Sequence, residues 1–339
     1  MSVCEGCPKN FGYIFNSCFN NNENSLKFLT EHNILPKSVK CPNCNSDCIY
    51  EKSRNSWKCN TFSYINKTKK KKHCGYSVSH YKGTFLEKTK LQPWQVVVFA
   101  YQWVQKNFSH KTTARLCEIS EKTSIDWRSF FCEVTNFWCQ NQEPIGGPDR
   151  IIEIDETLIS KAKYNRGRRP KQVWLFGGID RESKRRFIVP LIDEETVDSK
   201  PQPRNKTVLL PIIKKFILPG STIISDCWGA YNSLKNNSDF KHYRINHSKN
   251  FVSPQDQDVH TQTIERLWRD VKEWIKKPGI RPIYLPQYIG RYLFLKAAGE
   301  QELHNLFLEA AKLYPHSKEK QSVTFNPQED FSDEDLSDS

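Results

Sequence analysis

The chain has 339 residues, of which 37% are hydrophobic, 26% charged and 12% aromatic. This composition is typical of globular proteins, excludes collagen-like and wholly disordered chains, and the length allows several folded units. The longest apolar run, Trp94 to Val104, contains two glutamines and is far shorter than the roughly 20 apolar residues of a membrane-spanning helix. We therefore expect no membrane segment, and the first residues lack the pattern of a secretory signal.

The charge is strongly basic, with 51 Lys and Arg against 38 Asp and Glu and a net charge of +13. Acidic residues concentrate between Glu329 and Asp338, a stretch without a base, so the rest of the chain is more basic still. A basic body with an acidic tail favours a polyanionic partner, and nucleic acid is favoured over a membrane surface because no amphipathic anchor is visible.

Composition divides the chain into five regions. We expect a Cys- and Asn-rich segment at 1–36, a zinc-ribbon-like domain at 37–90, a helical region at 91–140, a domain of alternating strands and helices at 150–315 and a disordered acidic tail at 316–339.

Cysteines dominate the second region. The spacing of Cys41 and Cys44 is typical of a zinc knuckle, and Cys59 and Cys74 complete a set of four thiolates for a structural Zn²⁺. A lysine-rich insert at 67–72 separates the last two cysteines, and Cys48 or His73 remain alternatives for one ligand. Cys4 and Cys7 form another such pair with Cys18 nearby, but they lack a clear fourth ligand, so unpaired thiols are an equal alternative.

The helical region splits into two stretches between Ser109 and Trp138, around 118–120. This pattern resembles a helix-turn-helix in which Lys122 and Arg128, with Thr123 and Ser124, face a DNA groove. A plain pair of packed helices is the alternative, because the turn lacks the usual glycine. The residues that we expect in its core are Leu116, Ile119, Ile125 and Trp127.

The region from 150 alternates strand-like and helix-like runs. We predict strands at 151–155, 173–179, 186–192, 221–226 and 242–245, with helices at 206–216, 229–234 and 261–275. This order predicts an α/β fold with a mixed sheet flanked by helices, and it is the element order of an RNase H-like core.

Three acids occupy informative places in that order. Asp155 and Asp226 each end a strand, and Glu265 lies in the first turns of the last predicted helix. If the two strands are parallel neighbours, the acids meet at one edge of the sheet, where Mg²⁺ or Mn²⁺ would offset their repulsion. Each acid alone is also a common turn or cap residue.

Several strings within 150–298 resemble the ISXO2-like transposase domain of Merlin-type and IS1016-type elements. They comprise Ile152–Thr157, Lys163–Arg168, Val173–Ile179, Leu209–Ile213, Leu218–Trp228 and Val259–Trp268. The resemblance implies a DDE transposase with Asp155, Asp226 and Glu265 as its catalytic acids and two divalent metal ions. It also implies homo-oligomers that act on terminal inverted repeats and target DNA. Two departures are Arg266, where a glycine is common, and a long segment at 193–205.

Further residues are candidates for DNA contact. Arg166, Arg168, Arg169 and Lys171 crowd into a predicted loop that would clamp a DNA backbone, with a solvated charge run as the alternative. His260 is placed to touch the scissile phosphate or merely to lead into the helix. We expect Trp228 and Trp268 to pack in the core rather than to stack on bases.

These features together predict a cut-and-paste DNA transposase. The alternative is a domesticated DNA-binding protein that retains the fold without catalysis, and a host nuclease is disfavoured by the transposase-like strings. The clusters 69–72 and 166–171 are typical of nuclear import or DNA-binding patches, and if the host is eukaryotic we expect the protein in the nucleus.

Overall fold

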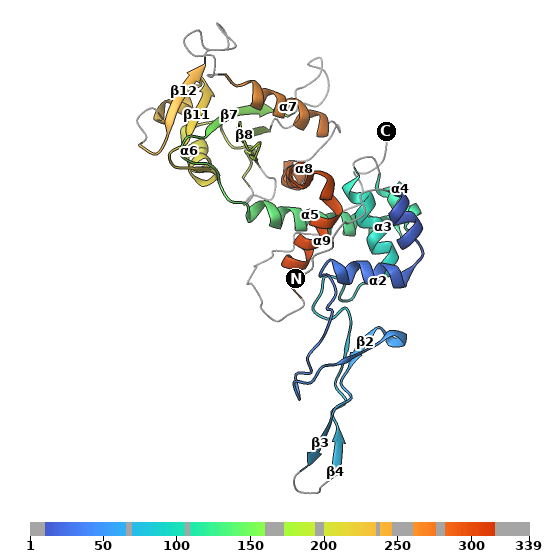
Figure 1. Cartoon of the computed structure of the whole chain (residues 1–339). Coiled ribbons are helices and arrows are strands. Elements are labelled where there is room, and N and C mark those ends of the chain that lie inside the picture. Colours follow the sequence, from blue (N-terminus) through green and yellow to red (C-terminus); the bar gives the residue numbers. More distant parts are fainter. Residues whose placement is uncertain are drawn as a thin grey trace. The chain divides into compact units, whose positions relative to one another are not determined.

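The computed structural model describes residues 11–65, 70–105, 109–159, 173–193, 200–234, 238–245, 260–275 and 282–315 (Figure 1). Its contacts form two compact units. The first contains Met1–Asn33 and Lys90–Leu313, and the second contains Ile34–Thr89 and Tyr314–Ser339. The loop cluster 166–171, Cys4, Cys7, the acidic tail and part of the lysine-rich insert lie outside the described residues.

The first unit contains a five-stranded sheet (Figure 1). Its order is β12-β11-β7-β8-β9. Strand β8 is antiparallel to both β7 and β9, whereas β11 is parallel to both β12 and β7. The bounds are β7 Ile151–Leu158, β8 Trp174–Asp180, β9 Arg186–Pro190, β11 Thr222–Asp226 and β12 Lys241–Ile245. The predicted mixed α/β fold is confirmed, and each predicted strand is present.

Helices cover both faces of this sheet. On one face, α6 (Lys206–Phe216) packs Leu209 and Ile213 against Ile152 and Ile154. On the other face, α7 (Gln262–Trp274) and α8 (Leu285–Ala298) pack against the alternate residues of β8, including Leu175. Because side chains alternate along a strand, the odd-numbered residues of β7, among them Asp155, face α7.

This unit also contains several shorter strands and helices. They are α1 Phe11–Tyr13, a π-helix Ile14–Cys18, α2 Asn22–Glu31, β6 Ile145–Gly146, β10 Ile217–Leu218, the 3₁₀ helices Gly229–Leu234, Pro282–Tyr284 and Gly299–Gln301, and α9 Glu302–Leu313. Strands β6 and β10 pair in parallel. Among the described helices, none combines the length and apolarity that crossing a membrane requires.

The apolar run of the sequence forms α3 (Pro93–Val104), a helix buried almost all round. Pro93 starts it at a position where a missing backbone N–H costs nothing, and the Gln95 side chain accepts the Gln92 backbone N–H. A helix that is hydrophobic on every side belongs in a core, which accounts for the composition of this segment.

A helix-turn-helix order follows, with α4 (His110–Leu116) and α5 (Glu121–Gln140). Glu118 adopts a left-handed conformation with φ 54° in the turn, taking the place usually filled by glycine. The expectation that Leu116 is in the core was wrong, since it is 40% exposed, whereas Cys117 and Phe131 are fully buried. Ser124 does not face a groove, because it is buried and donates its hydroxyl to the His110 carbonyl.

Lys122 is exposed near the start of α5, and Arg128 is partly buried. Helix α5 also packs against α8 and α9. It therefore belongs to a larger helical core and is not simply one member of an isolated helix pair.

The second unit contains two small sheets. The first has the order β1-β2-β5, from β1 (Ile49–Glu51), β2 (Ser56–Lys58) and β5 (Ser77–Ser79). A 3₁₀ helix at Lys52–Arg54 joins the first two strands. The second is the hairpin of β3 (Phe62–Ile65) and β4 (Lys70–His73).

Helices α2 and α9 meet through a buried histidine. The His32 ring stacks on Phe28 at 4.1 Å between centroids, lies 5.1 Å from the His304 ring, and donates from Nδ1 to the Phe28 carbonyl at 2.7 Å. Burial lowers the pKa of His32 to about 4, and the charge of His304 lowers it further. The neutral imidazole is therefore the form that this contact requires.

We predict that this contact weakens in acid. Since the folded-state pKa of His32 lies below its unfolded value, its stabilisation is present above pH ~6.5 and is lost as the pH falls through 4. The free energy of unfolding should fall by on the order of 2 kcal/mol more in the wild type than in His32→Gln between pH 7 and 4. Urea unfolding at several pH values measures this, and parallel pH curves for the two proteins would contradict it.

Candidate active site and cysteine cluster

Asp155 and Asp226 lie on adjacent parallel strands. The pairing of β7 with β11 aligns Ile152 with Ile223 and Glu153 with Ile224. The same offset, continued by two residues, puts Asp155 beside Asp226 at the carboxyl end of β11. Both side chains project toward the α7 face by strand alternation. In open α/β sheets, this end of the strands is where sites form.

The Asp155 carboxylate is held by α7. The Trp268 indole donates from Nε1 to Asp155 Oδ2 at 2.9 Å. Burial raises the pKa of Asp155 to about 7, and the like charges of Asp226 and Glu265 raise it further. The three predicted acids thus share one electrostatic neighbourhood.

Asp226 and Glu265 are more open than Asp155. Asp226 is half-buried, and its Oδ1 accepts the Trp228 backbone N–H at 2.9 Å. Glu265 is exposed in the first turn of α7. Within the described part of the chain, the three acids share this edge but are not gathered into a ready-made group of metal ligands, as the cysteines of the second unit are.

Glu153 was not singled out from the sequence, although it organises the edge. It is fully buried, and its Oε2 accepts the Ile264 backbone N–H at 2.9 Å. Its Oε1 accepts from Arg181 Nε at 2.6 Å, and His260 Nδ1 lies 3.5 Å away. These contacts tie the start of α7 to β7, so they position Glu265, the next residue of the helix. An acid within a run of isoleucines was the available signal.

His260 therefore contacts Glu153 with its ring, and its backbone carbonyl accepts from Arg181. This geometry favours the role of leading into the helix. Trp268 is buried as expected, whereas the expectation for Trp228 was wrong, because its side chain is 41% exposed.

Glu156 is a second acid that sequence reasoning missed. It projects to the α6 face of β7, is 8% exposed and lies beside the Tyr231 hydroxyl. Burial raises the pKa of Glu156 to about 7, Asp155 and Asp226 raise it further, and Arg204 opposes this rise.

Gly177 of β8 lets the indole of Trp268 reach the sheet. A Cβ at this position would lie 2.7 Å from the ring of Trp268 and 2.9 Å from the Phe187 carbonyl. Since real Cβ atoms do not approach so closely, any larger residue here must displace the indole that holds Asp155.

We predict that Gly177→Ala destabilises the protein by roughly 1–3 kcal/mol through overpacking. The matched control is Gly229→Ala, where a Cβ would meet no atom within 4 Å, and its stability should be unchanged or slightly raised. Thermal unfolding compares the two variants. Equal midpoints for both would show that the close approach of Trp268 does not constrain position 177.

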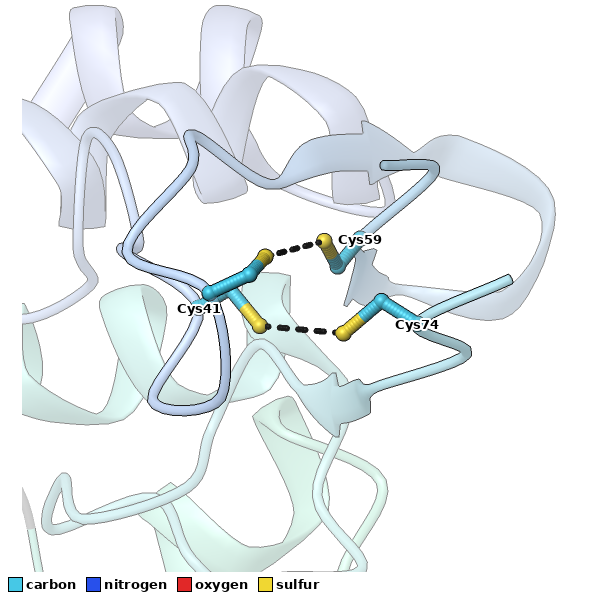
Figure 2. Close-up of side chains that lie close together, drawn as sticks. Cys41, Cys59 and Cys74 are labelled. Atoms are coloured by element: carbon cyan, nitrogen blue, oxygen red, sulfur yellow. Dashed lines mark hydrogen bonds between the residues drawn. The ribbon is translucent and has the colours of Figure 1, made fainter. Parts of the chain in front are cut away.

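The four predicted zinc ligands converge in the second unit. Cys41 Sγ lies 3.5 Å from Cys74 Sγ, and Cys44 Sγ lies 3.4 Å from Cys59 Sγ (Figure 2). All four sulfur atoms lie within 4.8 Å of one another. These separations exceed the roughly 2 Å of a disulfide. They are close to the ~3.8 Å between sulfurs around a tetrahedral Zn²⁺ with Zn–S bonds of about 2.3 Å.

Backbone hydrogen bonds build the cluster. Asn45, with φ 56°, turns the knuckle and donates its N–H to the Cys41 carbonyl at 2.8 Å. Cys59 donates to Tyr76 and Cys74 to Thr61, so antiparallel pairing continues from β2 and β5 into β3 and β4. The described part of the lysine-rich insert, residues 70–72, therefore belongs to strand β4, which returns the chain to Cys74 beside Cys59.

The donor set suits zinc. The N–H of Ser46 is the main cause that lowers the pKa of Cys44 to about 6, whereas burial raises that of Cys41 to about 12. A bound cation would hold all four thiols as thiolates. Cys48 packs against the cluster without belonging to the ligand group, and His73 contacts Phe62, at 5.0 Å between rings.

We predict one zinc ion per chain, lost on Cys41→Ser but retained on Cys48→Ser. Structural zinc sites contribute folding energy directly, so the first variant should expose residues 34–89 to proteases while the sheet of the other unit stays resistant. Metal analysis and limited proteolysis of the full chain check this. Zinc-supplemented wild-type protein that carries no stoichiometric zinc would refute it.

Part of the chain is similar to known proteins. Residues 146–295 match the family model described as the ISXO2-like transposase domain. This segment spans the whole five-stranded sheet with α6, α7 and most of α8. The resemblance to this family that the sequence motifs showed is therefore confirmed for this segment.

Two curated relatives are similar to the chain. The male abnormal protein mab-31 of Caenorhabditis elegans is 22% identical over 253 residues, 68% of this chain and 56% of that protein. An uncharacterized transposase-like protein of Haemophilus influenzae is 33% identical over 69 residues, 20% of this chain and 53% of that protein. The chain thus spans about half the length of each relative.

Two solved structures share a low likeness with the chain. The HTLV-2 integrase catalytic core domain, in complex with magnesium, is 14% identical, with a TM-score of 0.24 over 42% of this chain and 85% of that one. A simian T-cell lymphotropic virus intasome in complex with a PP2A regulatory subunit is 16% identical, with a TM-score of 0.26 over 46% of this chain and 52% of that one. The strand order and the family match, rather than these likenesses, define the class of the domain.

Proposed function

We propose that this protein is a DDE-type DNA transposase with an RNase H-like core that cuts transposon ends and joins them to target DNA. The carrying observation is that Asp155 and Asp226 lie on adjacent parallel strands of the matched domain, whose register, continued by two residues, places them side by side. The helix that bears Glu265 is fastened over them by the Trp268–Asp155 hydrogen bond. This sheet, with three antiparallel strands followed by two parallel ones, has the RNase H-like order.

The donor set of this edge suits Mg²⁺ or Mn²⁺. Asp155, Asp226 and Glu265 offer hard oxygen ligands. Burial first, and then the like charges of Asp226 and Glu265, raise the pKa of Asp155, and a cation would offset the repulsion between these acids. Two such ions, when bound, would activate a water or a 3′-hydroxyl and stabilise the leaving oxygen. Asp155, Asp226 and Glu265 would together hold these ions.

The protein's own residues set the geometry for this reaction. Trp268 fixes the orientation of Asp155, and Glu153 with Arg181 fixes the start of α7. Preorganised ligands matter because their displacement by about 1 Å is enough to reduce a rate severely.

Binding of DNA would be shared by other parts of the chain. In this proposal the zinc unit and α4–α5, through Lys122 and Arg128, hold terminal inverted repeats as a homo-oligomer, and His260 lies near the scissile phosphate. The cluster Arg166, Arg168, Arg169 and Lys171 grips the DNA backbone, and a eukaryotic host would carry the protein in its nucleus. The supporting observations are the net charge of +13 and the exposure of Lys122.

We predict that Asp226→Asn abolishes cleavage but spares binding. The substitution keeps the shape of the side chain and removes a charge that holds cations, so cleavage of a terminal-repeat duplex in Mg²⁺ should fall by several orders of magnitude. Affinity for the same duplex in Ca²⁺ should change little, because phosphate contacts elsewhere supply most of it. The control is Asp239→Asn, an exposed acid paired with Lys214 away from this edge.

The second candidate is a DNA-binding protein without catalysis. The relative that covers most of this chain, mab-31, carries a name that does not describe a transposase. Wild-type protein that binds terminal-repeat DNA tightly but cleaves it no faster than Asp226→Asn would establish this candidate instead.

A further inference from the structure

An arginine stands between two tryptophans beside the acid edge. The guanidinium carbon of Arg204 lies 3.7 Å from the centre of the Trp174 ring and 4.5 Å from that of Trp228. Arg204 lies two residues before α6, Trp174 begins β8, and Trp228 follows β11 by two residues. Three separate segments therefore combine to hold one side chain.

The stack is connected to the proposed catalytic acid. Trp228 donates from its indole Nε1 to the Arg204 carbonyl at 3.3 Å, and from its backbone N–H to Asp226 Oδ1 at 2.9 Å. One residue thus contacts both the arginine and the acid. Trp228 is 41% exposed, so the stack borders solvent at the same edge as Asp226.

The cation of Arg204 is not neutralised within the described structure. Among the described residues, no carboxylate lies within 4.0 Å of its guanidinium nitrogens, whereas Arg150 and Arg181 each have an acid partner. Its charge reaches buried Glu156, where it opposes the rise in pKa that burial, Asp155 and Asp226 cause.

The stacked geometry suits an anion with several oxygens. Rings cover the faces of a guanidinium, whereas its N–H groups point outward in its own plane. A planar fork with free N–H groups matches the paired oxygens of a phosphate in two parallel hydrogen bonds. The tryptophans also remove rotamer freedom from the long side chain before a ligand arrives, which lowers the entropic cost of binding.

We propose that Arg204 binds a backbone phosphate of the DNA strand that reaches the Asp155–Asp226 edge, with Trp174 and Trp228 holding its guanidinium in place. This inference rests on the proposed function. It adds a phosphodiester-binding position on the α6 side of the acids, outside the helices and loops assigned to DNA above.

The test measures the affinity of the full chain for a mixed-sequence DNA duplex in Ca²⁺ across a range of salt concentrations. Loss of one phosphate contact in Arg204→Gln should lower the slope of log K against log [salt] by about 0.9 and weaken binding roughly 3- to 10-fold. Lys215→Gln is the control, since it removes one exposed cation from the opposite end of α6 and should leave the slope unchanged. Circular dichroism and thermal unfolding confirm that each variant is folded.

Arg204→Lys separates phosphate binding from packing. Lysine keeps the charge but lacks the fork, so the slope should remain and the affinity should fall by about 3-fold. A wild-type slope and affinity in both Arg204 variants, with DNA binding by the wild type intact, would overturn the inference and leave the proposed function standing. A wild-type chain without salt-dependent DNA binding would instead overturn the proposed function, and this inference with it.

Discussion

Negative charge buried in the middle of a strand is the constraint on which the rest of the sheet depends. Strand β7 carries three acids in four residues, and the protein accommodates each of them differently. Glu153 is paired with Arg181 and a helix N–H, Asp155 is held by an indole, and Glu156 lies beside Tyr231 with Arg204 nearby. The two acids without a direct ion pair have pKa values raised to about 7. Such perturbed acids are typical of functional sites.

The same constraint explains why α7 cannot shift independently of the sheet. Its first turn is bonded to Glu153, and its second turn reaches Asp155 through Trp268. The glycine at position 177 is needed because the indole must lie almost on the backbone of β8. A helix fixed at two points one turn apart can present Glu265 in one orientation, which is the requirement for a site assembled from distant segments.

The sequence predicted the elements of the sheet region closely, because β-branched runs and helical spacing are strong local signals. It predicted poorly what depends on packing between distant segments. Leu116 has the spacing of a core residue, yet it is 40% exposed and its neighbour Cys117 is buried instead. Trp228 is apolar enough for a core, but its ring covers an arginine at the surface.

Local spacing also explains what could and could not be predicted of the two sites. The Cys41–Cys44 knuckle is a contiguous signal, whereas the closeness of Cys59 and Cys74 depends on hairpin pairing across the lysine-rich insert. Asp155 and Asp226 were predicted together because the ends of parallel strands meet at one edge. The expectation that Asp155 ends its strand was wrong, because β7 continues to Leu158, whereas Asp226 does end β11. The role of Glu153 depends on Arg181 and Ile264, both distant in sequence, and so had no local signature.

The hairpin between the last two cysteines also has an evolutionary consequence. Antiparallel pairing adds residues two at a time, one to each strand, so such an arm can lengthen or shorten by pairs while the sulfurs at its base keep their positions. A single-residue insertion would instead move every side chain beyond it to the opposite face of the strand, unless a β-bulge absorbed the extra residue. Related chains should therefore vary in the length of this arm mostly by even numbers of residues, with the metal site fixed and the reach of the arm free to change.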